Sequence, residues 1–211
     1  CEFLGSVNTL ISPAKIKNMT YMNPITSNAG LDVYENPIKD KTYVCTVDVA
    51  RGVSKDYSAF VIMDVTQMPF KIVAKFRNNE IRPLLFPHTI EKVCKAYNHA
   101  HVLVETNDLG QQIAEALQFE LEYDNLLMTT QRGRAGQILG AGFSGRGSGF
   151  GVKMTKQIKK IGCANIKTLI ESDKVFINDF NIIEEMSTFI RKGQSWQADD
   201  GSTDDLMMCL V

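Results

Sequence analysis

The run Thr42-Tyr43-Val44-Cys45-Thr46-Val47, closed by Asp48, holds the β-branched and aromatic residues that favour a buried strand. Two further strand-like runs follow at 59–63 and 70–76, with short polar connections between the three. Connections this short join antiparallel neighbours, so the three runs predict an antiparallel beginning to a central sheet.

Helical and strand patterns alternate through the rest of the chain. Helices are predicted at 84–98, from Asp108 onward, at 156–172 after a Thr155 cap, at 180–192 before Gly193, and from Asp204 onward. Strands are predicted at 102–104, 125–130, 175–177 and 195–198. This order predicts an α/β fold, a mixed central sheet with helices on both faces. Residues 1–41, rich in Asn, Pro, Ser and Thr, are expected to be an irregular lead-in packing on a domain at 42–211.

Composition excludes several classes of protein. The 211 residues are 44% hydrophobic and 22% charged, which excludes collagen-like, disordered and coiled-coil chains. No apolar run approaches the length of a membrane span, and no secretory leader is visible. The five cysteines form no Cys-x-x-Cys pair, so they are expected to be reduced core residues of an intracellular protein rather than zinc ligands.

Carboxylates stand where predicted elements begin or end. Asp48 ends the first strand, Glu105 follows the fourth, and Asp204 and Asp205 open the final helix. Strand ends of an open α/β sheet are the usual place for a site, and acids gathered there need cations to offset their repulsion. Oxygen ligands of this kind suit Mg²⁺ or Mn²⁺, and a pair of such ions can activate water and stabilise the leaving oxygen of a phosphodiester.

Other acids are less certain ligands. Asp56 is either a further metal-site carboxylate or a turn residue, and one of Asp204 and Asp205 can ligate while the other caps the helix. We favour Asp205 as the ligand. The pairs at 184–185 and 199–200 are expected to be solvated surface.

The net charge of −1 hides a strong segregation. No acid occurs between Asp124 and Glu171, and that glycine-rich window carries +8, which leaves −9 for the remainder. Exposed backbone and basic side chains of this kind favour a polyanion such as nucleic acid. The predicted DNA contacts are Arg132, Arg134, Arg146, Lys153, Lys156 and Lys160.

Three motifs in order resemble a known family. The segments 45–52 with 55–59, 102–110 and 204–207 resemble the C-terminal nuclease domain of the large terminase subunit of tailed bacteriophages, closest to the T-even-like myophages. The resemblance implies a ribonuclease H-like (resolvase/integrase-type) fold and a two-metal endonuclease that cuts concatemeric double-stranded viral DNA, with little sequence preference, during headful packaging. Its acids would be Asp48, Glu105 and Asp205.

The resemblance also implies a setting. An ATPase motor domain would precede this chain, because no phosphate-binding Gly-x-x-x-x-Gly-Lys-Ser/Thr occurs in it, and its start at Cys1 also leads us to expect a longer protein. The portal and the small terminase subunit would be partners, no membrane would be involved, and the site of action would be the cytoplasm of the infected bacterium rather than the mature virion.

Three alternatives stay open from the sequence. A Holliday-junction resolvase or integrase core would use the same acids on a four-way junction. A non-catalytic DNA-clamping module would bind DNA without metal. An actin-like nucleotide-binding half also begins with three antiparallel strands, but it would need an Asp-x-Gly phosphate loop where this chain has Asp48-Val49-Ala50.

Overall fold

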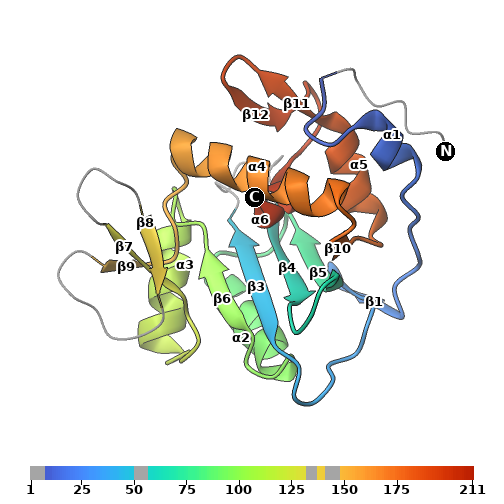
Figure 1. The fold of residues 1–211 in the computed structure, drawn as a ribbon. Helices are drawn as coiled ribbons and strands as arrows, with labels where there is room; N and C mark the ends of the chain where they lie inside the picture. Colours follow the sequence, from blue (N-terminus) through green and yellow to red (C-terminus); the bar gives the residue numbers. More distant parts are fainter. Residues whose placement is uncertain (1–7, 50–56, 132–136, 141–147) are drawn as a thin grey trace.

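A computed structural model describes residues 8–49, 57–131, 137–140 and 148–211, and its centre is a mixed sheet (Figure 1). The strands lie in the order β1-β2-β5-β4-β3-β6, with β10 also paired to β5. Their bounds are β1 Thr26–Asn28, β2 Leu31–Val33, β3 Tyr43–Asp48, β4 Ser58–Asp64, β5 Phe70–Asn78, β6 His101–Val104 and β10 Val175–Phe176. β3, β4 and β5 are antiparallel neighbours, while β6 runs parallel to β3, so the predicted α/β sheet is confirmed.

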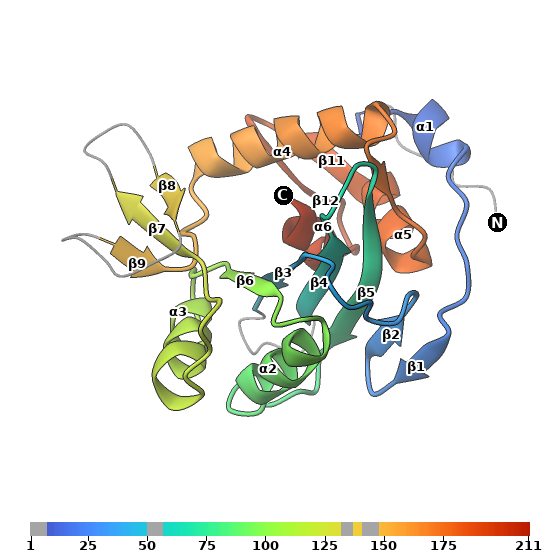
Figure 2. The same cartoon turned by 60° about the horizontal axis from the view of Figure 1, so that its bottom comes forward.

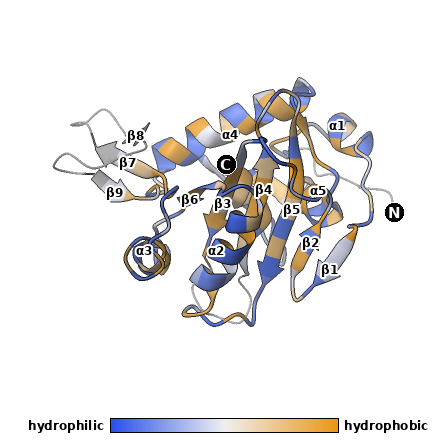
Figure 3. Ribbon diagram, turned by 90° about the horizontal axis from the view of Figure 1, so that it is seen from below, coloured by the Kyte–Doolittle hydropathy of each residue, from blue (hydrophilic) through white to orange (hydrophobic). Residues whose placement is uncertain are grey.

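Helices cover both faces of this sheet (Figure 2). α2 (Phe86–Ala96) and α3 (Gly110–Glu115), continued by η1 (Ala116–Glu120), pack on one face. α1 (Pro13–Lys17), α4 (Lys156–Glu171), α5 (Phe180–Thr188) and α6 (Asp205–Leu210) pack on the other. Figure 3 shows hydrophilic and hydrophobic residues alternating along α4, which is typical of a helix with one face on a core. Within the described residues, no helix is both long and apolar enough to span a membrane.

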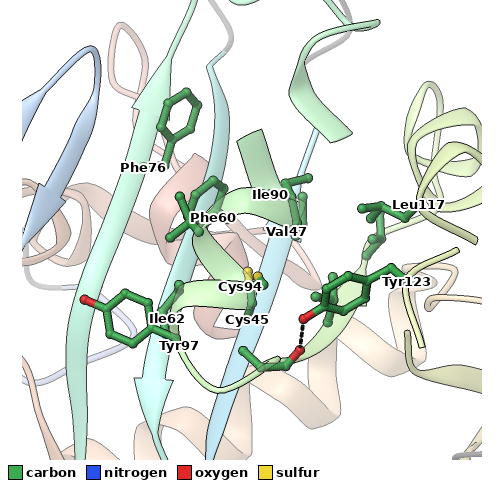
Figure 4. Packing of buried hydrophobic residues seen from close by; sticks show 14 of the residues in the cluster. Cys45, Val47, Phe60, Ile62, Phe76, Ile90, Cys94, Tyr97, Leu117 and Tyr123 are labelled. Carbon is green, nitrogen blue, oxygen red and sulfur yellow. Dashed lines mark hydrogen bonds between the residues drawn. The ribbon is translucent and has the colours of Figure 1, made fainter. Parts of the chain in front are cut away.

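The alternation of β3 separates two hydrophobic cores. Tyr43, Cys45 and Val47 are buried in the core under α2 and α3, so the alternate residues of β3, which end with Asp48, lie on the α6 side. In the first core Phe60 stacks on Phe76 with ring centroids 5.1 Å apart. Figure 4 shows this packing and the hydrogen bond from the Tyr123 hydroxyl to the Ala100 carbonyl, 2.7 Å long.

The cysteines behave as core residues. Cys45, Cys94, Cys163 and Cys209 are buried free thiols, as the sequence predicts, and Cys1 lies outside the described residues.

The lead-in is less irregular than expected. Within 8–41 the chain forms α1 and the hairpin of β1 and β2, and β2 pairs with β5. Ser12 caps α1 by accepting a hydrogen bond from the Lys15 N–H. The hydrogen-bonding edge of β5 is thereby covered by a segment with too little periodicity to predict as strand. Leu10, Ile11 and Ile16 of this segment are buried in the core on the α4 side of the sheet.

The predicted helix at 180–192 is wrong in its last third. α5 ends at Thr188, and Phe189–Lys192 forms β11, which pairs antiparallel with β12 (Ser195–Ala198). Gly193, with φ of 65°, therefore lies in a two-residue hairpin turn instead of ending a helix. The aromatic and β-branched residues Phe189 and Ile190 favour the strand, and Ile190 also bridges to Thr9.

The described parts of the glycine-rich basic window include strands. β7 (Met128–Gln131), β8 (Gln137–Gly140) and β9 (Ser148–Phe150) form a separate antiparallel sheet. The predicted strand at 125–130 is thus divided, because Leu126 bridges to Val102 of β6 before β7 begins. Residues 132–136 and 141–147, and with them Arg132, Arg134 and Arg146, lie outside the described part.

Candidate metal centre

The parallel pairing of β3 and β6 brings Asp48 and Glu105 together. Val47 is in register with Val104, and the Glu105 N–H donates a 2.9 Å hydrogen bond to the Val47 carbonyl. Both valines are buried in the core under α2 and α3. Since side chains alternate along strands, Asp48 and Glu105 leave the strand ends on the opposite face, toward α6.

The turn that carries Glu105 is held by two close backbone approaches. A Cβ on Gly110 would lie 1.7 Å from the Glu105 carbonyl oxygen, so only glycine fits there. On the other side Val152 bridges to Glu105, and its N–H donates to the Val104 carbonyl at 2.8 Å. The Asn107 side chain also bonds both backbone groups of Met154 at 3.0 Å. The backbone at Glu105 is therefore held by the segment before α4 as well as by β6.

α6 brings the third acid to the same place. Leu206, Met207 and Cys209 are buried with Ala59 of β4, and α6 packs on β3 and β4. Burial raises the pKa of the Cys209 thiol, and the negative charge of nearby Asp48 raises it further. Asp205 is the first residue of this docked helix, and its negative charge acts on Asp48 at the end of β3.

The shifted pKa of Asp48 indicates that these acids lie near one another. Burial raises the pKa of Asp48 well above its usual value, and the negative charges of Glu105, Asp205 and Asp204 raise it further. We call these four residues the carboxylate cluster. The repulsion is the cost expected of acids gathered without a cation.

Asp204 and Asp205 differ in what they contact. Asp204 accepts a hydrogen bond from the Ala198 N–H at 3.2 Å, and its Oδ2 lies 3.9 Å from the Lys159 Nζ. It occupies the N-cap position of α6, yet its side chain makes no capping hydrogen bond. Asp204 is thus directed toward β12 and α4, which supports Asp205 as the ligand.

The carboxylate cluster fits a hard divalent cation by its chemistry. Its donors are carboxylate oxygens, the ligands that Mg²⁺ and Mn²⁺ prefer, and a cation would relieve the repulsion that raises the pKa of Asp48. Among the described residues, no three or more His, Cys, Asp or Glu side chains stand close enough together to hold a metal ion as they are placed. Asp56 lies outside the described residues.

Basic residues lie beside the carboxylate cluster. α4 begins at Lys156, capped by the Thr155 hydroxyl, directly after the segment that holds Glu105. Lys153, Lys156 and Lys160 are exposed, so their ammonium groups are available to phosphates. Lys159 is turned inward, toward Asp204 and the Phe189 ring.

The sequence missed one acid near the cluster. Glu185 was expected at the surface, but it is only 3% exposed, whereas Glu184 is exposed as predicted. Burial raises the pKa of Glu185 to about 8; the Met207 N–H and Arg77 oppose this, while Asp205 and Asp204 add to it. Helical spacing was the available signal, because Glu185 falls on the buried stripe of α5 with Ile182 and Met186. Asp199 and Asp200 are exposed, as predicted.

Comparison with known proteins decides the family. Residues 45–210 match the model of the terminase RNase H-like domain, a span that includes Asp48, Glu105 and Asp205. The chain belongs to this family. The match covers nearly the whole domain described above, so the fold predicted from the three motifs is confirmed.

Solved structures of other terminase nucleases share this fold. The large terminase nuclease of the thermophilic phage G20c, solved with bound cobalt and with bound magnesium, is 20% identical, with 97% of this chain and 95% of that one covered at a TM-score of 0.72. The large terminase nuclease domain of Thermus phage P74-26 is 18% identical, with 96% and 92% covered at a TM-score of 0.68.

Proposed function

We propose that this terminase RNase H-like domain is a divalent-metal-dependent endonuclease that cuts concatemeric double-stranded viral DNA, with low sequence specificity, during headful genome packaging. The observation that carries the proposal is the convergence of Asp48, Glu105 and Asp205 from β3, β6 and α6, marked by the raised pKa of Asp48. Family membership and the magnesium, cobalt and zinc bound to the G20c nuclease support metal use.

The three acids would hold two Mg²⁺ or Mn²⁺ ions, with Asp48 as the proposed bridging ligand. When bound, such ions supply an activated water and charge stabilisation for the leaving oxygen of a phosphodiester. The protein's own part is to fix the acids. The backbone bond between Glu105 and Val47 and the docking of α6 on β3 and β4 hold the ligands before DNA arrives.

DNA would lie across the start of α4. The exposed Lys153, Lys156 and Lys160 offer charge to the phosphate backbone, and Arg132, Arg134 and Arg146 are proposed to add to it. Contacts of this kind give salt-sensitive affinity without reading the bases, which agrees with low sequence specificity.

The setting is part of the proposal. An ATPase motor domain would precede this nuclease domain at 42–211 and its lead-in, and the portal and small terminase subunit would be its partners in the cytoplasm of the infected cell. The resemblance of the three motifs to T-even-like myophages supports this arrangement and the headful mode of cutting.

A plasmid-nicking assay with Mg²⁺ or Mn²⁺, with and without EDTA, tests the proposal. We expect nicked and linear products only with metal, and none with Asp48→Asn at equal protein concentration. Metal-independent cutting, or full activity of Asp48→Asn, would contradict it. A four-way junction is added as a second substrate, since preferential cutting there would assign a resolvase-type activity, and DNA binding without metal binding or cutting would assign a clamping module.

A further inference from the structure

The buried carboxylate of Glu185 accepts hydrogen bonds from the chain on both sides of Asp205. Glu185 Oε2 accepts a 2.8 Å hydrogen bond from the Met207 N–H. Its other oxygen, Oε1, accepts one of 3.2 Å from the Thr203 hydroxyl. Thr203 and Met207 are each two residues from Asp205, so the two oxygens of Glu185 bracket this acid along the backbone.

The bracket is tied to the central sheet by Arg77. Its Nη2 donates a 2.6 Å hydrogen bond to the Thr203 hydroxyl and lies 3.5 Å from Glu185 Oε1. Arg77 is in register with Ala59 on β4, and Ala59 is in register with Asp48 on β3. Paired residues share a face of a sheet, so Arg77 and Asp48 stand in one row beneath α6. The contacts among Arg77, Thr203 and Glu185 therefore fix the position of α6 relative to the strand that carries Asp48.

Stability alone is a poor reason for this arrangement. The first N–H groups of a helix are usually satisfied by the side chain of the N-cap residue. Here Asp204 occupies that position but bonds Ala198, and Glu185 serves Met207 from another helix. Placing a nearly fully buried carboxyl group behind the carboxylate cluster is unfavourable, because burial and the neighbouring acids both oppose its ionisation. We therefore explain the burial of Glu185 by the part of the chain that it holds in place, the start of α6 with Asp205.

We propose that Glu185 is a positioning residue, which holds Asp205 at the carboxylate cluster through Thr203 and Met207. The inference rests on the proposed function and deepens it, because it assigns the support of one metal ligand to a residue outside the cluster. Outer partners that orient metal ligands commonly account for 10- to 100-fold in metal affinity or activity, as a rough range.

The test compares Glu185→Leu, which removes both acceptors, with Glu185→Gln, which keeps one oxygen for the Met207 N–H. Glu184→Leu is the matched control, because Glu184 is the exposed neighbour on the same helix. Mn²⁺ binding is measured on the 211-residue protein without DNA by electron paramagnetic resonance of the free ion. Plasmid nicking is then followed against Mn²⁺ concentration, and DNA binding is measured in EDTA.

We expect Glu185→Leu to weaken Mn²⁺ binding by about tenfold or more and to raise the Mn²⁺ concentration for half-maximal nicking in parallel. Glu185→Gln should recover most of the affinity, Glu184→Leu should match the wild type, and DNA binding in EDTA should be equal for all. Equal Mn²⁺ affinity of Glu185→Leu and wild type would overturn the inference, and so would a loss in Glu184→Leu as large as in Glu185→Leu.

Thr203→Val tests the same inference if Glu185→Leu does not fold. It removes the hydroxyl that links Arg77 to Glu185, at a residue that is only partly buried. Weakened Mn²⁺ binding by folded Thr203→Val, restored in Thr203→Ser, supports the inference; wild-type binding by Thr203→Val overturns it. A wild-type protein that neither binds Mn²⁺ nor nicks DNA overturns the proposed function as well, whereas an active wild type with unaffected variants overturns only the role of Glu185.

Discussion

Asp48 and Glu105 occupy adjacent positions at the ends of two parallel strands, linked by the hydrogen bond from the Glu105 N–H to the Val47 carbonyl. The pairing is a backbone property, so the two carboxylates stay neighbours whatever their protonation or metal state.

Replacing Asp48 with the neutral Asn should abolish nicking without lowering the stability of the fold. Asp48→Asn removes a proposed bridging ligand, so nicking should fall to background. It also relieves repulsion from Glu105, Asp205 and Asp204, so the melting temperature in EDTA should equal or exceed that of the wild type. Mg²⁺ should then raise the melting temperature of the wild type and not of the variant, because only a folded state that binds metal is stabilised by it. A large loss of stability in EDTA would mean that Asp48 is structural.

Gly110→Ala should disturb the turn that carries Glu105. The new Cβ would lie 1.7 Å from the Glu105 carbonyl oxygen, so the backbone must move, at a cost of about 1–3 kcal/mol in the free energy of unfolding. Nicking should fall as well, because Glu105 moves with its carbonyl. Gly149→Ala is the control, since a Cβ there meets nothing within 4 Å. Urea denaturation and plasmid nicking measure the two effects, and wild-type values for both would refute the tight turn.

Reversing two exposed lysines of α4 should weaken DNA binding without affecting the fold. For Lys156→Glu with Lys160→Glu we expect a lower affinity for every duplex sequence and a salt dependence reduced by about two phosphate contacts. Fluorescence anisotropy at several salt concentrations gives both quantities. Lys92→Glu, exposed on α2 across the sheet, is the control. An unchanged salt slope would remove α4 from the DNA-binding surface.

The ionisation of Asp64 should make the free energy of unfolding depend on pH in the acid range. Burial alone would raise the pKa of Asp64, but hydrogen bonds from Lys41 and Thr66 outweigh it and lower the pKa below its usual value. A lowered folded-state pKa means that the ionised carboxylate stabilises the fold above the unfolded-state pKa, near 4, and that this stability is lost as pH falls through the folded-state pKa.

Asp64→Asn should therefore cost about 1.5–3 kcal/mol in the free energy of unfolding at neutral pH, and the difference from wild type should shrink toward about pH 3. Urea denaturation across this pH range measures it. Asp200→Asn is the control, because Asp200 pairs with Lys192 in full contact with solvent and should lose almost nothing. A constant difference between Asp64→Asn and wild type at all pH values would contradict the assignment.

Several elements could be predicted from local pattern because local chemistry forms them. The alternation of Tyr43, Cys45 and Val47 produces β3, and the Thr155 hydroxyl caps α4 where the sequence predicts. The helix expected at 180–192 was wrong beyond Thr188 because pairing with β12 and Thr9 outweighs helical spacing. Helical spacing along α5 places Glu185 on the buried side of the helix. The prediction of a surface position came from its charge instead.

Local pattern was enough to predict that Asp48 and Glu105 lie at strand ends, that Asp204 and Asp205 open a helix, and that positive charge concentrates between Asp124 and Glu171. These are properties of neighbouring residues, and each depends on periodicity or composition alone. The contacts of Asp204 with Ala198 and Lys159, and the burial of Glu185 against α6, could not be predicted in this way. They depend on contacts between α6, β12, α5 and α4, which are far apart in the chain and meet only when the sheet and its helices have packed.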